Sequence, residues 1–169
     1  MVRIEKAGSG DLQKISDMAE VVFRHTYREI LSPEQLDYMM DMMYSMPNLQ
    51  TQIEEGHHYY IAYDVAPRGY VSVQYEGADN DGIEVFHLHK IYVMSDAQGR
   101  GIGIKLFNRV VEHVKEACGG KPARIELNVN KFNKSVEFYK HIGMRVLLEE
   151  DFPIGNGFYK TDYIMGLDL

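Results

Sequence analysis

The chain has 169 residues, 45% of them hydrophobic, and a formal net charge of −7. This length suits one domain with a substantial core, so residues 1–169 are expected to form a single domain. The acidic charge disfavours nucleic acid as a partner and favours a cationic one, while the single cysteine excludes an internal disulfide. The N-terminus lacks the apolar core of a signal peptide, and no apolar run reaches the ~18 residues that cross a bilayer. We therefore expect a cytoplasmic protein that does not enter a membrane.

The first third of the chain is predicted to form one strand and two helices. A strand is expected over 2–7, and a helix that begins near Ser9 carries apolar residues at a spacing of three and four. The second helix begins at Ser32-Pro33-Glu34-Gln35, where a capping serine, a proline at the first helical position and a glutamine that closes a capping box coincide. Its wide apolar arc suits an adaptable groove, the core or a homodimer contact, and comprises Leu36, Met39, Met40, Met42, Met43 and Met46.

The middle of the chain changes to strand patterns. Aromatic and β-branched residues predict strands over 59–64, 70–75 and 83–94. The last of these is apolar on both faces apart from His87, His89 and Lys90, which is typical of a central strand. In an ideal pleat both histidines share a face with Ile91 and Val93.

The last third is predicted to alternate helices and strands. We expect helices over 104–118 and 132–141 and strands over 125–129, 144–148 and 159–167. The acidic run from Glu149 to Asp151 is expected to be a solvated turn. Because the order of elements mixes hairpins with two crossover helices, it favours a mixed α/β sheet over a doubly wound parallel one.

A glycine-rich segment, Gln98-Gly99-Arg100-Gly101-Ile102-Gly103, separates the central strand from the helix after it. Such a loop presents backbone N–H groups and the positive end of the helix dipole, which suits a phosphate. Ile104 and Leu106 stand where a dinucleotide fingerprint needs glycine or alanine, and the spacing does not fit a P-loop. A turn that only begins a helix is the alternative, which three glycines at alternate positions disfavour.

The pattern Gln98-x-x-Gly101-x-Gly103 after an apolar strand resembles the acyl-CoA motif of the GCN5-related N-acetyltransferase (GNAT) superfamily. A downstream block resembles the second motif of that superfamily: Leu127-x-Val129, Asn133, Ser135, Phe138-Tyr139 and Gly143-Met144. The similarity in order covers essentially the whole chain. It implies the GNAT fold, a mostly antiparallel sheet of about seven strands, splayed at the acyl-CoA site, with about four helices. Within the superfamily, Ser32-Pro33-Glu34 and residues 161–165 resemble the PaiA-like polyamine acetyltransferases.

The resemblance implies a set of residues that bind acetyl-CoA, and no metal. Arg100 would add a charge-assisted contact to a phosphate oxygen. Residues 91–93 would offer backbone groups to the pantetheine arm while also packing in the core, and Asn133 would contact the cofactor or cap a helix. The full set is Ile91, Tyr92, Val93, Gln98, Gly99, Arg100, Gly101, Ile102, Gly103, Ile104 and Asn133.

Three residues are candidates for proton transfer. Tyr139 matches the family position that protonates the departing thiolate, and its alternative role is a helical tyrosine with its ring in the core. A primary amine with a pKa near ~10.4 must lose a proton before it attacks. Many relatives carry a carboxylate on the strand before the loop, whereas this chain has His87 and His89, which are mostly neutral near physiological pH. Both could instead be buried and hydrogen-bonded, with Glu84 as the remaining carboxylate, and two histidines alone do not predict a metal site.

The sequence thus predicts an enzyme that moves an acetyl group from acetyl-CoA to a primary amine by direct attack in a ternary complex. The acidic charge favours a cationic acceptor, and the resemblance to PaiA-like enzymes implies that this acceptor is a small polyamine. The alternatives are an amino acid, a peptide or protein amine, an aminoglycoside-like compound, or a sensor that binds acyl-CoA without turnover.

Overall fold

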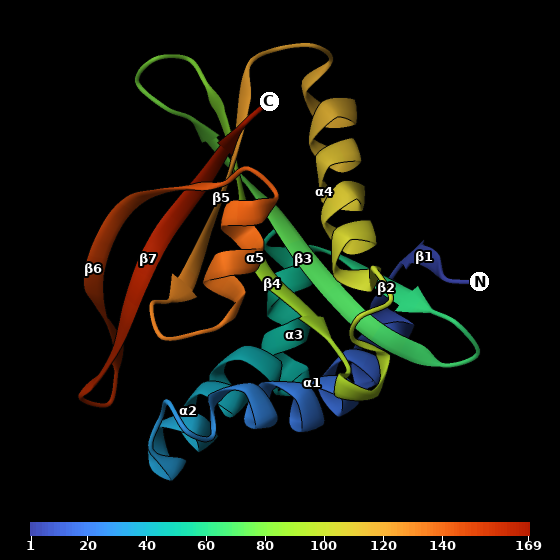
Figure 1. The fold of residues 1–169 in the computed structure, drawn as a ribbon, viewed down its shortest axis with the longest axis vertical. Coiled ribbons are helices and arrows are strands. Elements are labelled where there is room, and N and C mark those ends of the chain that lie inside the picture. The colour runs from blue at the N-terminus through green and yellow to red at the C-terminus, as the bar shows by residue number, and fades with distance from the viewer.

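The computed structural model describes residues 1–169 and has one seven-stranded sheet with helices on both faces (Figure 1). Its order is β1-β2-β3-β4-β5-β7-β6, and only β4 and β5 are parallel. This confirms the predicted mixed, mostly antiparallel sheet. The strands are β1 (Arg3–Lys6), β2 (His58–Tyr63), β3 (Pro67–Ala78), β4 (Glu84–Val93), β5 (Ala123–Asn130), β6 (Arg145–Gly155) and β7 (Phe158–Asp168).

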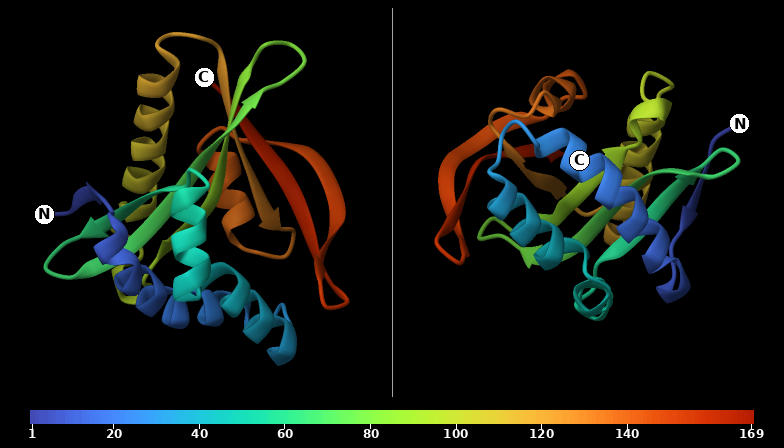
Figure 2. Two further views of the ribbon diagram at one scale, coloured as in Figure 1. Left: turned by 180° about the vertical axis from the view of Figure 1, so that it is seen from behind. Right: turned by 90° about the horizontal axis from the view of Figure 1, so that it is seen from below.

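Five α-helices cover the sheet, one more than expected. Helices α4 and α5 pack on one face, and α1, α2 and α3 pack on the other (Figure 2). No helix is both long and apolar enough to span a membrane. The helices are α1 (Leu12–Tyr27), α2 (Pro33–Tyr44), α3 (Met46–Glu54), α4 (Ile102–Cys118) and α5 (Ser135–His141).

The start of α2 agrees with the predicted cap in part. The Ser32 hydroxyl accepts the N–H of Gln35 at 3.1 Å, and Pro33 occupies the first turn. The Gln35 side chain does not close a capping box, because it donates instead to the carbonyl of Tyr159 at 2.7 Å. The contact to Tyr159 ties α2 to the β6–β7 hairpin, which local sequence patterns cannot show.

Helix α3 was not predicted. Ser45 ends α2 and also caps α3, because its hydroxyl accepts the N–H of Asn48 at 3.4 Å. The apolar pattern crosses this boundary without a break, so the two helices read as one. Most of the methionine-rich arc is core: Leu36, Met39 and Met40 are buried, and Met42 and Met43 pack against the same cluster.

A β-bulge interrupts β4. Its register against β3 pairs Ser72 with Lys90 and Val73 with Leu88, so His89 has no partner on β3. An inserted residue of this kind reverses the alternation of side chains beyond it.

The bulge changes which β4 side chains share a face. Ile91 and Val93 pack with Leu88 in the core beneath α4. His87 and His89 lie on the other face, where they contact Glu76 and Gln74 of β3. The expectation that the histidines share a face with Ile91 and Val93 is therefore wrong.

Strand β6 is longer than expected and contains the residues expected in a solvated turn. Glu149, Glu150 and Asp151 pair with Tyr163, Asp162 and Thr161 of β7. Their side chains are exposed because β6 is the outer strand of the sheet, so an acidic run alone did not distinguish an edge strand from a turn.

The sheet splays between its two parallel strands. Strand β4 pairs with β5 only along Glu84–His87, opposite Ala123–Glu126. Beyond this short ladder the strands separate, so the second half of β4 has β3 on one side and no strand on the other. The splay is the predicted one, and it opens beside the glycine-rich segment.

Candidate active site

The glycine-rich segment links β4 to α4 in a conformation that favours glycine. Gly99 and Gly101 have φ angles of +81° and +75°. A Cβ added at either position would meet no atom within 4 Å, so the backbone angle rather than crowding accounts for glycine. Gly101 is also the N-cap of α4, without a side chain that caps the helix.

The loop presents a row of free hydrogen-bond donors. The N–H groups of residues 98–104 donate to no acceptor within the protein. Helix N-termini leave such donors unpaired and carry a partial positive charge from the aligned peptide dipoles. The segment is therefore suited to bind a phosphate group.

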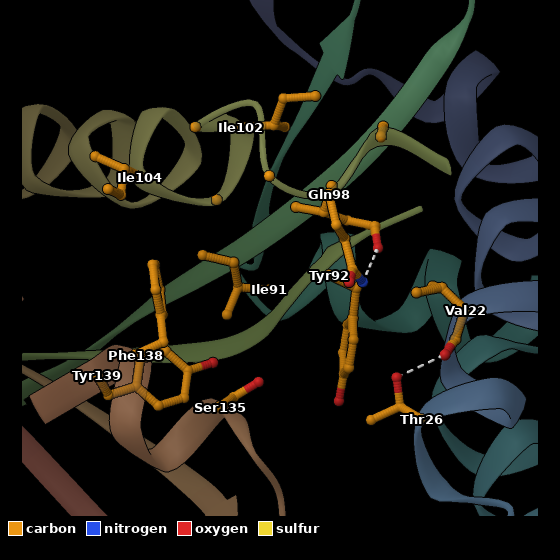
Figure 3. A pocket seen from close by; sticks show the side chains of 15 residues that line it. Val22, Thr26, Ile91, Tyr92, Gln98, Ile102, Ile104, Ser135, Phe138 and Tyr139 are labelled. Atoms are coloured by element: carbon orange, nitrogen blue, oxygen red, sulfur yellow. Dashed lines mark hydrogen bonds between the residues drawn. The ribbon is translucent and has the colours of Figure 1, made fainter. Parts of the chain in front are cut away.

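A cavity of about 470 Å³ lies between this loop, β4 and α5 (Figure 3). The unpaired side of β4 borders it, so backbone groups of 91–93 are available to an extended ligand. The carbonyl of Val93 already has one hydrogen-bond partner, because the Gln98 side chain donates to it at 3.2 Å. The lining includes Tyr139 and all the predicted cofactor-binding residues except Arg100 and Asn133.

Arg100 is engaged elsewhere. Its guanidinium lies 3.1 Å from a carboxylate oxygen of Asp64, in the turn between β2 and β3. The pKa of Asp64 lies below its usual range, mainly because the N–H of Ala66 and the guanidinium of Arg68 stabilise its charge. In this conformation the guanidinium is held at the turn between β2 and β3, and Arg100 does not line the cavity.

Asn133 uses both ends of its amide within the protein. Its oxygen accepts the N–H of Ser135 at 2.8 Å, and its nitrogen donates to the hydroxyl of Tyr27 at 3.1 Å. The Tyr27 hydroxyl also lies 3.3 Å from that of Tyr92. In this conformation Asn133 supports the start of α5 and links it to α1, which fits the capping alternative.

Tyr139 lies on α5 with its ring in the gap between that helix and β4 (Figure 3). Burial raises its pKa, and the nearby hydroxyl of Tyr27 adds to the effect. The phenol therefore keeps its proton at physiological pH, which suits a proton donor and excludes a phenolate base.

A small chamber joins Tyr139 to one of the histidines. It has a volume of about 20 Å³, enough for about one water molecule. Tyr139 and Ser135 line both this chamber and the larger cavity, and His89 lines the chamber alone. The structure therefore brings His89 and Tyr139 to the same space, at the inner end of the splay.

The tautomer of His89 follows from its partner. Gln74 donates through its amide nitrogen to the carbonyl of Glu55, so its oxygen faces Nε2 of His89 at 2.9 Å. Nε2 therefore carries the proton, and Nδ1 keeps the basic lone pair. Burial, followed by the nearby charges of His87 and His57, lowers the pKa of His89 to about 2.

His87 lies beside His89 but does not line the chamber. The centres of the two rings are 4.4 Å apart, and Nδ1 of His87 lies 3.2 Å from a carboxylate oxygen of Glu76. Glu84 lies farther still, at the opposite end of β4 from the loop, where it accepts the hydroxyl proton of Tyr75 at 2.5 Å. Neither cavity at the splay is lined by Glu84.

Several residues of the site were not predicted from the sequence. Gln74 orients His89, and Tyr27 supports Asn133 from a distant helix. Asp162 is a buried carboxylate on β7, near an amide nitrogen of Asn128 at 3.4 Å. Each contact joins segments far apart in the chain, so no local spacing indicates it. No group of three or more histidine, cysteine or carboxylate side chains is placed to hold a metal ion.

Free donors at a helix N-terminus and an adjacent strand edge suit a ligand that combines phosphate groups with an amide-containing arm. Coenzyme A thioesters have this construction, which places the protein in the class of acyl-CoA-dependent acyltransferases. The family model of the acetyltransferase (GNAT) domain matches residues 27–165. The chain belongs to this family, as the two sequence motifs implied.

Individual relatives agree with this assignment. An uncharacterized N-acetyltransferase of Methanocaldococcus jannaschii is 38% identical over 79 residues, which are 46% of this chain and 34% of that protein. The chain thus matches about a third of that relative's length. PaiA N-acetyltransferase of Thermoplasma acidophilum, solved with coenzyme A, has a TM-score of 0.77 at 20% identity, over 98% of both chains. Arabidopsis thaliana Naa50, solved with a bisubstrate analogue, has a TM-score of 0.65 at 18% identity, over 98% of this chain and 97% of that one.

Proposed function

We propose that this protein transfers the acetyl group of acetyl-CoA to the primary amine of a small cationic acceptor, within a ternary complex. One observation carries the proposal: the loop with free N–H groups, the free edge of β4, Tyr139 and His89 all border two cavities at the splay that share lining residues. Residues 1–169 would act as a single catalytic domain. The one cysteine, Cys118, is free and buried, which suits a reducing compartment such as the cytoplasm.

The cavity fits the cosubstrate in two respects. The N–H groups of residues 98–104 would bind the pyrophosphate, and the backbone of 91–93 would pair with the amides of the pantetheine arm. The thioester would then lie at the inner end of the cavity, where Tyr139 and Ser135 meet the smaller chamber.

Proton transfer in this arrangement is divided between two residues. The amine nitrogen attacks the thioester carbon, and Nδ1 of His89 takes one amine proton, directly or through a water molecule in the chamber. The carbon–sulfur bond breaks, and the hydroxyl of Tyr139 protonates the departing thiolate. Because burial disfavours both a charged imidazole and a phenolate, His89 would then return its proton to the oxygen of Tyr139, directly or through water in the chamber, which restores both residues.

The acceptor would approach from the face that carries His89. The buried carboxylate of Asp162 lies on this side and would attract an ammonium group. Lys160 lies 3.3 Å from Asp162, so a cationic acceptor would have to displace or share this lysine.

A contact between α2 and the β6–β7 hairpin narrows the space through which an acceptor would reach this face. The hydroxyl of Tyr38 donates to the carbonyl of Ile154 at 2.8 Å, and the Gln35 side chain donates to that of Tyr159. The ring of Tyr38 also packs on Phe158, with ring centres 5.5 Å apart. Because these contacts between α2 and the hairpin restrict the space, they favour a small acceptor over a folded protein.

A competition experiment tests the acceptor class. Acetyl-CoA is mixed with the enzyme and equal concentrations of putrescine, spermidine, free amino acids and a lysine-containing peptide, and the products are identified by mass. We expect acetylated polyamines to form first, and Asp162→Asn to raise the KM for them. The exposed substitution Glu116→Gln on α4 is the matched control and should leave that KM unchanged. Exclusive acetylation of the peptide or of an amino acid would contradict the proposed acceptor.

A further inference from the structure

The two outer strands of the sheet have different edges. Strand β1 is four residues long, and three of its side chains are exposed and charged: Arg3, Glu5 and Lys6. Short, charged edges of this kind protect a sheet from pairing with another chain. Strand β6 has 11 residues, is exposed from Arg145 to Asp151, and has no partner on its outer side. The second edge is therefore the longer of the two, and its charged residues and its proline lie mostly beyond Leu148.

The part of β6 before its acidic run is apolar. Val146, Leu147 and Leu148 are consecutive and are 41%, 39% and 46% exposed. A bulge lies between Val146 and Leu148, so Leu147 contacts Gly166 while Leu148 pairs with Ile164 of β7. Because Ile164 and Gly166 are two residues apart on one strand, both leucines lie on the same face. An edge with adjacent leucines on one face is suited to pair with a second strand of the same kind.

We propose that this edge forms a homodimer, in which the β6 strands of two copies pair antiparallel about a two-fold axis between Leu147 and Leu148. In this register Leu147 of each copy faces Leu148 of the other, and Arg145 faces Glu150. The Cα partners of these residues on β7 put Arg145, Leu148 and Glu150 on the face that Leu147 shares. Each of these residue pairs occurs twice, once on each side of the axis, as a two-fold interface requires.

The charges and the ends of the strand support this register. Glu150 has no ion-pair partner within its own chain, whereas Arg145 is paired at 2.9 Å with Asp168 on the surface. Two Arg145–Glu150 contacts, one at each side of the axis, would offset part of the repulsion between two chains of charge −7. Pro153 lacks an N–H group and would end the pairing beyond the acidic run.

Sedimentation equilibrium of the full chain tests the dimer, over about 1 to 200 µM. We expect the wild-type mass to approach twice that of the chain. Reversing one charge, as Arg145→Glu or Glu150→Arg, should weaken the dimer about tenfold, because it puts like charges opposite each other twice. The double reversal Arg145→Glu with Glu150→Arg should restore it, and Leu148→Lys should abolish it.

A matched control and a folding check complete the test. Val21→Lys changes an exposed valine on α1 and should leave the dimer intact. Circular dichroism should show that every variant is folded, since all the changed side chains are exposed. A wild-type chain that stays monomeric over the whole range would overturn the proposal. So would a dimer that neither Leu148→Lys nor the single reversals weaken.

Discussion

At the scale of single residues, the proposed mechanism assigns proton donation to Tyr139 and proton acceptance to His89, and burial shifts the pKa values of these two side chains in opposite directions. Tyr139 is buried, and the pKa of its phenol is raised, so it would enter the proposed reaction with its proton. His89 is mostly buried, and burial lowers the pKa of an imidazole, so it would enter without a proton. Burial thus fixes the protonation state of both groups at physiological pH, although it also makes the imidazole of His89 a weaker base than a free histidine.

The phenylalanine variant of Tyr139 tests the donor. Because a thiol is already a tolerable leaving group near neutral pH, Tyr139→Phe should lower kcat by no more than about 100-fold, the low end for general acid catalysis. The dissociation constant of coenzyme A, measured by titration calorimetry, should change little. A variant with the wild-type kcat would remove Tyr139 from the mechanism.

A pair of glutamine variants separates the two histidines. His89→Gln should lower kcat by about 100-fold, because it removes the basic imidazole of a residue that lines the chamber. The matched variant His87→Gln should keep most of the activity, since His87 does not line the chamber. Both rates are measured with saturating acetyl-CoA and amine.

The pH dependence of kcat/KM for the amine provides a second test of His89. Its pKa of about 2 leaves it neutral through the physiological range, so the profile should rise with the ionisation of the acceptor amine alone. A break near the usual histidine pKa of ~6.5 that His87→Gln removes would identify the other histidine as the base.

At the scale of elements, the loop before α4 combines two glycines with different roles. Gly101 has a positive φ, whereas an added Cβ at Gly103 would lie 3.6 Å from the ring of Phe138 and 3.9 Å from Val93. The first glycine serves the backbone of the helix cap, and the second leaves space between two residues that line the cavity.

Two alanine variants distinguish these roles. Gly101→Ala should destabilise the fold by about 1–2 kcal/mol, because the left-handed conformation strains a side chain. Gly103→Ala should leave the melting temperature nearly unchanged but weaken coenzyme A binding, because the methyl group narrows the cavity. Differential scanning fluorimetry and titration calorimetry measure the two effects. Equal losses of stability in both variants would contradict this division.

The sequence predicted elements well wherever a signal was local. Ser32 and Pro33 located the start of α2, and the glycine loop located the start of α4. The boundary between α2 and α3 was missed because apolar spacing continues through Ser45. The bulge at His89 was missed because it depends on the register against β3, which a single strand does not reveal.

The site, like the elements, could be predicted only where residues close together in the chain form a motif. The loop and Tyr139 were found because motif residues close together in the chain carry them, and both border the cavity. The involvement of Gln74 and Asp162 depends on strand pairing, and the engagement of Arg100 by Asp64 depends on a distant turn. Contacts of this kind become visible only when the sheet is assembled.

At the scale of the whole molecule, we expect two half-buried histidines to make stability depend on pH. Burial lowers the pKa of His57 and of His113 to about 4. The unfolded chain, with an ordinary histidine pKa of ~6.5, therefore binds protons more readily than the folded chain over the interval between these values. The stabilising contribution is complete above pH ~6.5 and is lost as the pH falls toward 4.

Urea unfolding at several pH values tests this dependence. We expect the free energy of unfolding to fall between about pH 7 and 5, and to fall less in His57→Gln, whose side chain does not titrate. The control His25→Gln changes an exposed histidine on α1 and should keep the wild-type dependence. An unfolding free energy that is flat over this interval would show that the folded and unfolded chains bind protons equally, and would contradict the lowered pKa values of these imidazoles.

The most direct test of the proposed chemistry is the release of free thiol from acetyl-CoA by the purified chain, with and without a polyamine, at about pH 8. We predict release that requires the amine and saturates with its concentration. Acetyl-CoA binding without thiol release, for polyamines, amino acids and peptides alike, would contradict a transferase and indicate a sensor that only binds acyl-CoA.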